Sequence, residues 1–234
     1  MKDTSFYNKE SGAYSEKRYP KLAADYAHFF FKKRLSVLLS MLERITARQQ
    51  GIRILEIGCA DGVVAAAMSD LDSVGAVIGI DISADMIEEA KSKNRSPKIS
   101  FFVRGQEDQR ASYDVIVEVG VLNLTDRNLE YAYADDHLKV GGYYICSLAS
   151  RTSLRARIKF RDDGGGFAHL LTFEEYEKEL RERFEVIKSV PYGLFIPFLW
   201  RSPMIGRFLQ PLEAILRPLG PRLFHEKIYL LRKK

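Results

Sequence analysis

Two acidic residues, one of them beside glycines, have the types and spacing best suited to binding a small ligand. Glu56 lies near the end of a predicted strand, and Gly58 and Gly62 follow it. Glycines here permit a tight turn and let the backbone approach a ligand closely, and a helix starting near Gly62 offers free N–H groups. Asp81 ends the next predicted strand. Because an ionised carboxylate has two acceptor oxygens, Asp81 can accept hydrogen bonds from two ribose hydroxyls.

The same turn lacks the fingerprint of a dinucleotide-binding site. That fingerprint requires glycine at positions 58, 60 and 63, whereas this chain has Ala60 and Val63. The sequence therefore predicts a ligand that contains ribose, bound without a well-formed pyrophosphate cradle.

Five segments, in order along the chain, resemble the motifs of class I S-adenosylmethionine-dependent methyltransferases of the small-molecule type. Residues 55–62 are similar to the first motif of that family, acidic-x-Gly-x-Gly/Ala-x-Gly, and the later matches are residues 79–83, 104–107, 113–118 and 138–142. The resemblance extends over roughly residues 43–190. It implies S-adenosyl-L-methionine as the cofactor and S-adenosyl-L-homocysteine as its product.

The resemblance also implies roles for individual residues. It places Asp81 at the ribose and Met86 against the adenine. Gln106 stands where the family usually has an aspartate that binds the adenine amino group, so we expect this contact from Gln106 or from Glu107. The expected cofactor-binding residues are Tyr14, Arg18, Glu56, Gly58, Cys59, Gly62, Asp81, Ile82, Met86, Gln106, Glu107 and Glu118, and no metal site is expected.

The N-terminal stretch, residues 7–19, carries several aromatic residues ahead of the first long predicted helix. In similar methyltransferases such a segment folds over the cofactor as a lid. We therefore expect Tyr14 or Arg18 to meet the methionine carboxylate. The alternative is a solvated arm with a few aromatic anchors.

Methyl transfer from a sulfonium depends mostly on positioning, with removal of a proton if the acceptor is a hydroxyl. His169 lies in a glycine-rich loop after the fifth predicted strand, which faces the acceptor in similar methyltransferases. It is the candidate general base. The alternatives are Glu118, Asn123, and Asp162 or Asp163.

The other histidines and both cysteines are expected to have no part in the chemistry. His28, His137 and His225 lie in or beside predicted helices and strands, where structural or surface roles are favoured. Cys59 and Cys146 are predicted to be packing residues, since methyl transfer from a sulfonium needs no thiol nucleophile.

The elements that must position these residues alternate between strands and helices. Strands are predicted at residues 52–57, 76–80, 99–103, 113–119, 143–148, 185–190 and 227–231, and helices at 20–47, 84–93 and 126–138, with another after the capping box Thr172–Glu175. Near-continuous apolar strands between helices indicate an α/β, doubly wound fold with a parallel sheet covered on both faces. The resemblance makes this a seven-stranded, Rossmann-like methyltransferase sheet whose last strand is antiparallel.

We expect a single methyltransferase domain over residues 1–234. It would comprise an N-terminal lid and helix (1–50), the cofactor-binding core (51–190), an amphipathic helical insertion (191–222), and the last strand with a basic tail (223–234).

Composition excludes several classes of protein. The 234 residues are 46% hydrophobic and 29% charged, which is normal for a globular chain and excludes disordered and fibrous classes. No apolar run approaches the roughly 20 residues of a membrane span, and no secretory signal is visible at the start. Two cysteines do not make a disulfide framework. A cytoplasmic protein is expected, with peripheral contact at the inner membrane face left open.

The net charge of +5 is concentrated at one end of the chain. Residues 1–150 carry 19 basic and 21 acidic residues, whereas residues 186–234 carry 9 basic and 2 acidic ones. Within that end, residues 192–222 form an amphipathic, aromatic and basic insertion before the last strand. It could face lipid headgroups, cover an acceptor pocket as a lid, form a homodimer interface, or pack on the protein's own sheet.

Nucleic acid is not expected as a substrate. Residues 118–121 read Glu-Val-Gly-Val, which does not resemble the Asn/Asp-Pro-Pro-aromatic sequence of base-amine methyltransferases, and neither cysteine follows a proline as in cytosine-C5 enzymes. We expect an O-methyltransferase that acts on a small molecule, a saccharide or a lipid-linked intermediate. The alternatives are C- or N-methyl transfer to a comparable acceptor, or a cofactor-binding assembly partner without catalysis.

Overall fold

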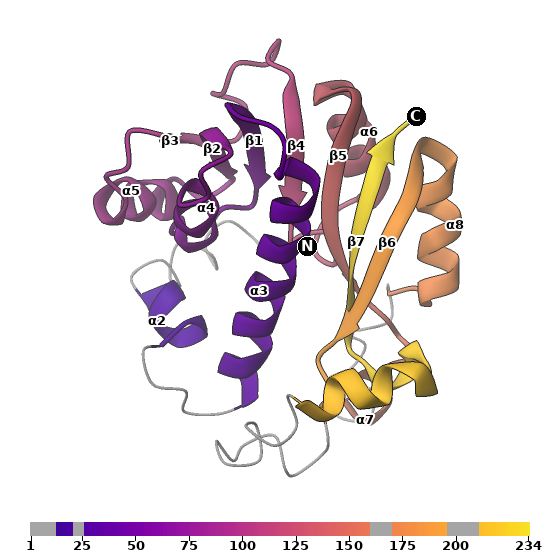
Figure 1. The fold of residues 1–234 in the computed structure, drawn as a ribbon. Coiled ribbons are helices and arrows are strands. Elements are labelled where there is room, and N and C mark those ends of the chain that lie inside the picture. Colours follow the sequence, from indigo (N-terminus) through magenta and orange to yellow (C-terminus); the bar gives the residue numbers. More distant parts are fainter. Residues whose placement is uncertain (1–12, 21–25, 160–169, 196–210) are drawn as a thin grey trace.

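A seven-stranded sheet forms the centre of the computed structural model, which describes residues 13–20, 26–159, 170–195 and 211–234 (Figure 1). The strands are β1 (Ile52–Ile57), β2 (Val74–Asp81), β3 (Ile99–Val103), β4 (Tyr113–Glu118), β5 (Leu138–Ala149), β6 (Phe184–Tyr192) and β7 (Glu226–Lys233), in the spatial order β3-β2-β1-β4-β5-β7-β6. Strands β1 to β5 pair in parallel, while β7 runs antiparallel to both β5 and β6. This confirms the predicted fold class.

Helices cover both faces of the sheet. The helices are α2 (Tyr14–Arg18), α3 (Tyr26–Thr46), α4 (Val63–Ser69), α5 (Ala84–Lys93), α6 (Arg127–His137), α7 (Leu154–Lys159) and α8 (Phe173–Arg183). One buried cluster joins α3, α4 and α5 to the sheet, and a second joins α6 and α8 to its other face. Strands buried from both sides explain the near-continuous apolar runs in the sequence.

Two helix starts follow the predicted local chemistry. The hydroxyl of Ser83 accepts a hydrogen bond from the backbone N–H of Met86 over 3.2 Å, which caps α5. Thr172 and Glu175 form the predicted reciprocal capping box at the start of α8. A side-chain acceptor at this position satisfies a backbone donor that the helix itself leaves unpaired.

Strand β5 begins earlier than predicted, at Leu138 rather than at residue 143. Leu138 pairs with Tyr113, after which the register shifts before Val115 pairs with Tyr143. The positive φ of Gly141, +74°, lies within this irregular stretch. Gly141 and Gly142, which precede the predicted strand, therefore lie in an irregular segment inside the observed one.

The start and end of the insertion between β6 and β7 pack on the rest of the protein. Tyr192, Leu194 and Phe195 are buried in the core. The carboxylate of Glu213 accepts hydrogen bonds from the backbone N–H groups of Gly193, over 3.2 Å, and Leu194, over 3.0 Å. Residues 196–210, the middle of the predicted amphipathic stretch, lie outside the described residues.

Candidate active site

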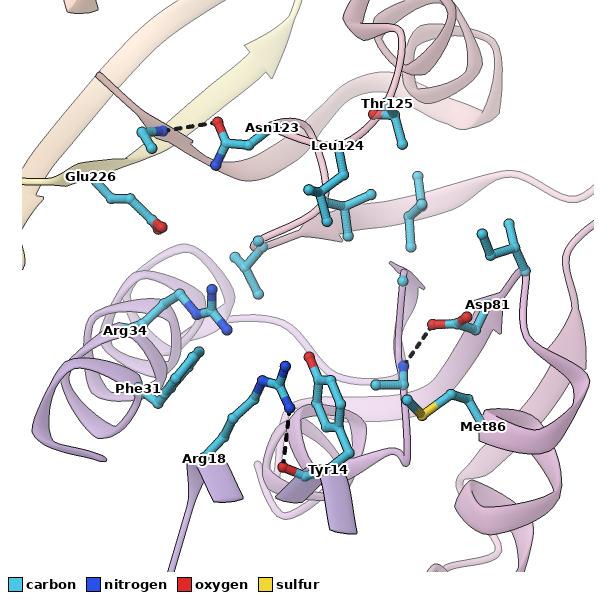
Figure 2. Close-up of a pocket in the computed structure, with 18 of the residues that line it drawn as sticks. Tyr14, Arg18, Phe31, Arg34, Asp81, Met86, Asn123, Leu124, Thr125 and Glu226 are labelled. Atoms are coloured by element: carbon cyan, nitrogen blue, oxygen red, sulfur yellow. Dashed lines mark hydrogen bonds between the residues drawn. The ribbon is translucent and has the colours of Figure 1, made fainter. Parts of the chain in front are cut away.

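A cavity of about 380 Å³ lies at the carboxyl ends of β1, β2 and β4 (Figure 2). Its walls come from α2 and α3, from the turns that follow these three strands, and from the start of β7. In an open α/β sheet this edge is where ligands bind, beside the point where the strand order reverses. Here the chain runs outward from β1 through β2 to β3 on one side of the sheet. It then crosses back to β4 on the other side of β1, so the strand order reverses beside β1.

The carboxylate of Asp81 lines one end of the cavity and is held by backbone hydrogen bonds. Its Oδ2 accepts from the N–H of Ala60 over 3.0 Å, and its Oδ1 accepts from the N–H of Ser83 over 2.9 Å. Partial burial raises the pKa of Asp81, and these backbone hydrogen bonds act against that rise. Each oxygen has further acceptor capacity, so a fixed carboxylate is available to donors in the cavity.

The turn after β1 brings the backbone close to the cavity. The N–H groups of Gly58 and Cys59 both donate to the carbonyl oxygen of Ile80, over 2.8 and 3.0 Å, which closes the turn against β2. Gly58 has φ +72°, and a Cβ on it would lie 2.3 Å from Cγ2 of Val121. Only glycine avoids both the strain and the clash at this position.

Six of the predicted cofactor-binding residues line the cavity, and six do not. Those that line it are Tyr14, Arg18, Gly58, Asp81, Ile82 and Met86, and those that do not are Glu56, Cys59, Gly62, Gln106, Glu107 and Glu118. Met86 is buried and, in Figure 2, lies on the same side of the cavity as Asp81. The arrangement gives this end of the cavity a carboxylate, a thioether and apolar walls.

The side chains of Gln106 and Glu107, which were expected to contact an adenine, are not among those that line the cavity. Gln106 is exposed. The carboxylate of Glu107 accepts from the N–H of Gly105 over 2.6 Å and from the hydroxyl of Tyr133 over 2.7 Å. Burial would raise the pKa of Glu107, but these hydrogen bonds outweigh it and lower the pKa. Glu107 thus ties the end of β3 to α6.

Of residues 104–107, Arg104 lines the cavity. Its guanidinium makes a bidentate ion pair with Glu130, with N–O distances of 2.8 and 2.9 Å, and lies 4.9 Å from the ring centre of Tyr133. Two fixed partners hold the side chain in place.

Glu56 and Glu118 are buried and are not among the residues that line the cavity. Burial, with the nearby carboxylates of Asp81 and Asp61, raises the pKa of Glu56. Burial and Glu130 raise the pKa of Glu118 to about 8, although the hydroxyl of Tyr144 donates to it over 2.5 Å.

The N-terminal segment lies over the cavity, as Tyr14 and Arg18 of α2 form part of its wall (Figure 2). The guanidinium of Arg18 lies 3.7 Å from the ring centre of Tyr14. Burial raises the pKa of Tyr14 to about 12, so the phenol is protonated. Asp61 anchors the segment: its carboxylate accepts from the backbone N–H of Ser15 over 3.0 Å and from Nζ of Lys93 over 2.9 Å.

The cavity also contains residues that sequence reasoning did not assign to it. Arg34 of α3 and Glu226 of β7 face each other at the end of the cavity opposite Asp81 (Figure 2). His225, for which a structural or surface role was predicted, lines the cavity as well. No local motif marks these three residues, because Arg34 lies near one end of the chain and His225 and Glu226 lie near the other.

The predicted general base and two of its alternatives cannot be placed. His169, Asp162 and Asp163 lie outside the described residues. Asn123 does line the cavity, and its Oδ1 accepts from the backbone N–H of Ala149 over 3.0 Å. Among the described residues, no group of three or more His, Cys, Asp or Glu side chains could hold a metal ion.

Residues 54–142 match the family described as the methyltransferase domain. The core of this chain is a class I S-adenosylmethionine-dependent methyltransferase domain. The matched segment runs from β1 into β5, so it holds the turn after β1, Asp81 and the end of β4.

Two curated relatives are O-methyltransferases. Malonyl-[acyl-carrier protein] O-methyltransferase of Bacillus anthracis is 29% identical over 137 residues, which are 56% of this chain and 51% of the relative. The mitochondrial ubiquinone biosynthesis O-methyltransferase of Candida albicans is 33% identical over 82 residues, 32% of this chain and 25% of the relative. This methyltransferase chain therefore spans about half the length, or less, of these relatives.

Solved structures share the fold of the methyltransferase domain over the whole chain. Magnesium protoporphyrin IX methyltransferase of Synechocystis PCC 6803, solved with bound S-adenosylhomocysteine, has a TM-score of 0.66 at 14% identity and covers 100% of both chains. At this identity the likeness shows the fold alone.

Proposed function

We propose that this chain binds S-adenosylmethionine in the cavity and methylates an oxygen atom of a small hydroxylated acceptor. The observation that carries the proposal is the Asp81 carboxylate, fixed by two backbone N–H groups at one end of a cavity whose other end holds charged side chains. The cofactor, when bound, supplies a methyl group that is already electrophilic, so the protein's contribution is mainly positioning.

The residues of the cavity fit this cofactor. Asp81 has the acceptor oxygens that a ribose diol requires, and Ile82 and Met86 offer apolar surface beside it for an adenine ring. Arg18, a cation of the wall, would pair with a methionine carboxylate. The proposal thus keeps the prediction that Tyr14 or Arg18 meets the methionine carboxylate.

Oxygen is the proposed methyl acceptor because the curated relatives that match are O-methyltransferases. A small molecule, a saccharide or a lipid-linked intermediate would present such an oxygen to the cavity. Methylation of carbon or nitrogen, and a role as a cofactor-binding assembly partner without catalysis, are the alternatives. Residues 119–126, which directly follow β4, include no histidine, so the proposal uses none there.

Two measurements test the proposal. Titration calorimetry with S-adenosylhomocysteine should show one site per chain, and incubation with candidate acceptors should release S-adenosylhomocysteine only when an oxygen acceptor is present. Absence of binding heat would refute the cofactor assignment. Binding without release for any acceptor class would favour the assembly partner, and release with an amine alone would favour N-methyl transfer.

We also propose that the insertion contacts a membrane surface. Leu212, Ile215 and Leu219 are 40%, 68% and 72% exposed; along the chain, Arg217 lies between the last two and Arg222 follows them. Apolar side chains with adjacent cations suit binding to anionic lipid. Among the described residues, no helix is long and apolar enough to cross a membrane.

Flotation with vesicles of anionic lipid tests this contact. The double variant Ile215→Glu with Leu219→Glu should float less than the unchanged chain at equal melting temperature. Equal flotation of the two proteins would contradict membrane contact, and a loss of dimer in the variant would instead favour the homodimer interface.

A further inference from the structure

Glu226, at the start of β7, places a carboxylate inside the cavity (Figure 2). We propose that Glu226 forms the subsite for the acceptor, in which its carboxylate accepts a hydrogen bond from an uncharged hydroxyl group, and that the subsite excludes acceptors whose reacting group is a carboxylate. This inference rests on the proposed function. It adds the chemical class of the acceptor and the residue that selects it.

One oxygen of Glu226 is already engaged. The hydroxyl of Tyr192, which is fully buried, donates to Oε2. Burial and the carboxylate of Glu226 raise the pKa of Tyr192, so the phenol keeps its proton and acts as the donor. In the described part of the chain, no other side chain donates to this carboxylate, and Oε1 is left for a donor within the cavity.

The position of Glu226 is set by the sheet. It pairs with Ala149 on β5 and with Tyr192 on β6, so both neighbouring strands fix its backbone. The residue itself is only 6% exposed. A residue on a central strand is positioned more rigidly than one on a loop, as a selective contact requires.

Arg34 faces Glu226 with the opposite charge. Its guanidinium lies 4.9 Å from the ring centre of Phe31, and its Nε is buried without a hydrogen-bond partner in the described part of the chain. Burial acts to lower the pKa of Arg34, but Tyr19, Tyr192 and Glu226 outweigh it and raise the pKa. The cation and the carboxylate therefore balance each other's charge at this end of the cavity.

A hydroxyl group suits this pair and a carboxylate does not. A hydroxyl can donate to Glu226 while it accepts from Arg34. A carboxylate has no proton to donate, and it would face the negative charge of Glu226, which is itself buried, where like charges repel more strongly than in water. Asp81 and Met86 lie at the other side of the cavity in Figure 2, so the subsite is separate from the proposed cofactor end.

Ligand-observed NMR on the protein saturated with S-adenosylhomocysteine tests the inference with two matched pairs of probes. Benzyl alcohol is compared with benzoate, and methyl glucoside with methyl glucuronide, so that each pair contrasts a hydroxymethyl group with a carboxylate. We expect the neutral member of at least one pair to bind at least about tenfold more tightly than its anion. The pair that binds distinguishes an aromatic acceptor from a saccharide.

Variants assign the preference to Glu226. Glu226→Gln should reduce the preference by about tenfold by admitting the anion, whereas Glu226→Asp, which keeps the charge, should keep the anion out. Glu185→Gln removes the same charge from an exposed position on β6 and should change nothing. Melting temperatures identify variants that do not fold, and Glu226→Asp then carries the test.

Three results would overturn the inference: binding of neither neutral probe, equal binding of anion and neutral probe, or an unchanged preference in Glu226→Gln. The failure of the proposed function looks different. In that case S-adenosylhomocysteine does not bind the unchanged protein, whereas failure of this inference leaves its affinity intact in every variant.

Discussion

The backbone N–H of Ala60 donates to Oδ2 of Asp81 over 3.0 Å, which joins the turn after β1 to the end of β2. Ala60 has φ +48°, a left-handed conformation that is rare outside glycine and costs about 1 kcal/mol or more. The strained turn thus aims a donor at the carboxylate. It fixes Asp81 before any ligand arrives, and less ordering is then required on binding.

Asp81→Asn should weaken binding of S-adenosylhomocysteine by roughly 10- to 100-fold, as expected for loss of charged hydrogen bonds. The amide keeps one acceptor oxygen but turns a donor toward the N–H of Ala60 or Ser83. Titration calorimetry measures the change. Asp72→Asn, at an exposed position in the turn before β2, is the matched control and should bind normally. Equal affinity in both variants would remove Asp81 from the binding site.

Gly58→Ala should destabilise the protein far more than Gly51→Ala. Both glycines have positive φ, +72° and +69°, but a Cβ at position 51 has nothing within 4 Å, whereas a Cβ at position 58 meets Val121 at 2.3 Å. We expect about 1 kcal/mol for Gly51→Ala and several times that for Gly58→Ala, measured by denaturant unfolding. Similar losses in the two variants would show that backbone strain alone sets the cost.

The stability of the protein should fall as pH rises toward about 8, in part because of Glu118. Burial and Glu130 raise the pKa of Glu118 from 4.5 to about 8. The folded protein therefore binds this proton more tightly than the unfolded chain, so the stabilisation is complete below about pH 4.5 and is lost as the pH rises through about 8. The free energy of unfolding should decrease by up to about 1.4 kcal/mol per pH unit in this window.

Glu118→Gln should flatten this pH profile without abolishing it, since the pKa of Glu56 is also raised. Urea unfolding at several pH values between 5 and 9 provides the measurement. Glu185→Gln, at an exposed site, should leave the slope unchanged. An unchanged slope in Glu118→Gln would mean that Glu118 titrates near its ordinary pKa.

Asp61→Ala should release the N-terminal segment. The carboxylate of Asp61 holds the backbone N–H of Ser15 and Nζ of Lys93. Its removal should speed trypsin cleavage after Lys17 and Arg18, and weaken binding of S-adenosylhomocysteine by about tenfold. If binding weakens but cleavage does not change, Asp61 acts on the turn after β1 rather than through α2.

Glu89→Ala is the control for this experiment. Glu89 also pairs with Lys93, over 3.0 Å, but among the described residues its side chain forms no hydrogen bond or ion pair with α2. We expect cleavage and affinity close to those of the unchanged protein.

Local sequence patterns determined most of the fold. Alternating apolar strands and helices predicted the doubly wound sheet, Ser83 and Thr172 marked two helix starts, and the glycine turn with Asp81 marked one end of the cavity. These features depend on residues close together in the chain, where backbone preferences and capping hydrogen bonds act. Such preferences can be deduced from the sequence alone.

Only the tertiary structure decided which distant residues share the cavity. Arg34 and Glu226 come from opposite ends of the chain, and they face each other because β7 inserts between β5 and β6 and α3 packs against the same sheet. Glu107, expected at the ligand, is instead bound by Tyr133 of α6. Packing and strand register set these contacts, and neither is encoded in the spacing of neighbouring residues. The sequence by itself therefore indicated the proposed cofactor end of the cavity, and the proposed acceptor end followed from the fold.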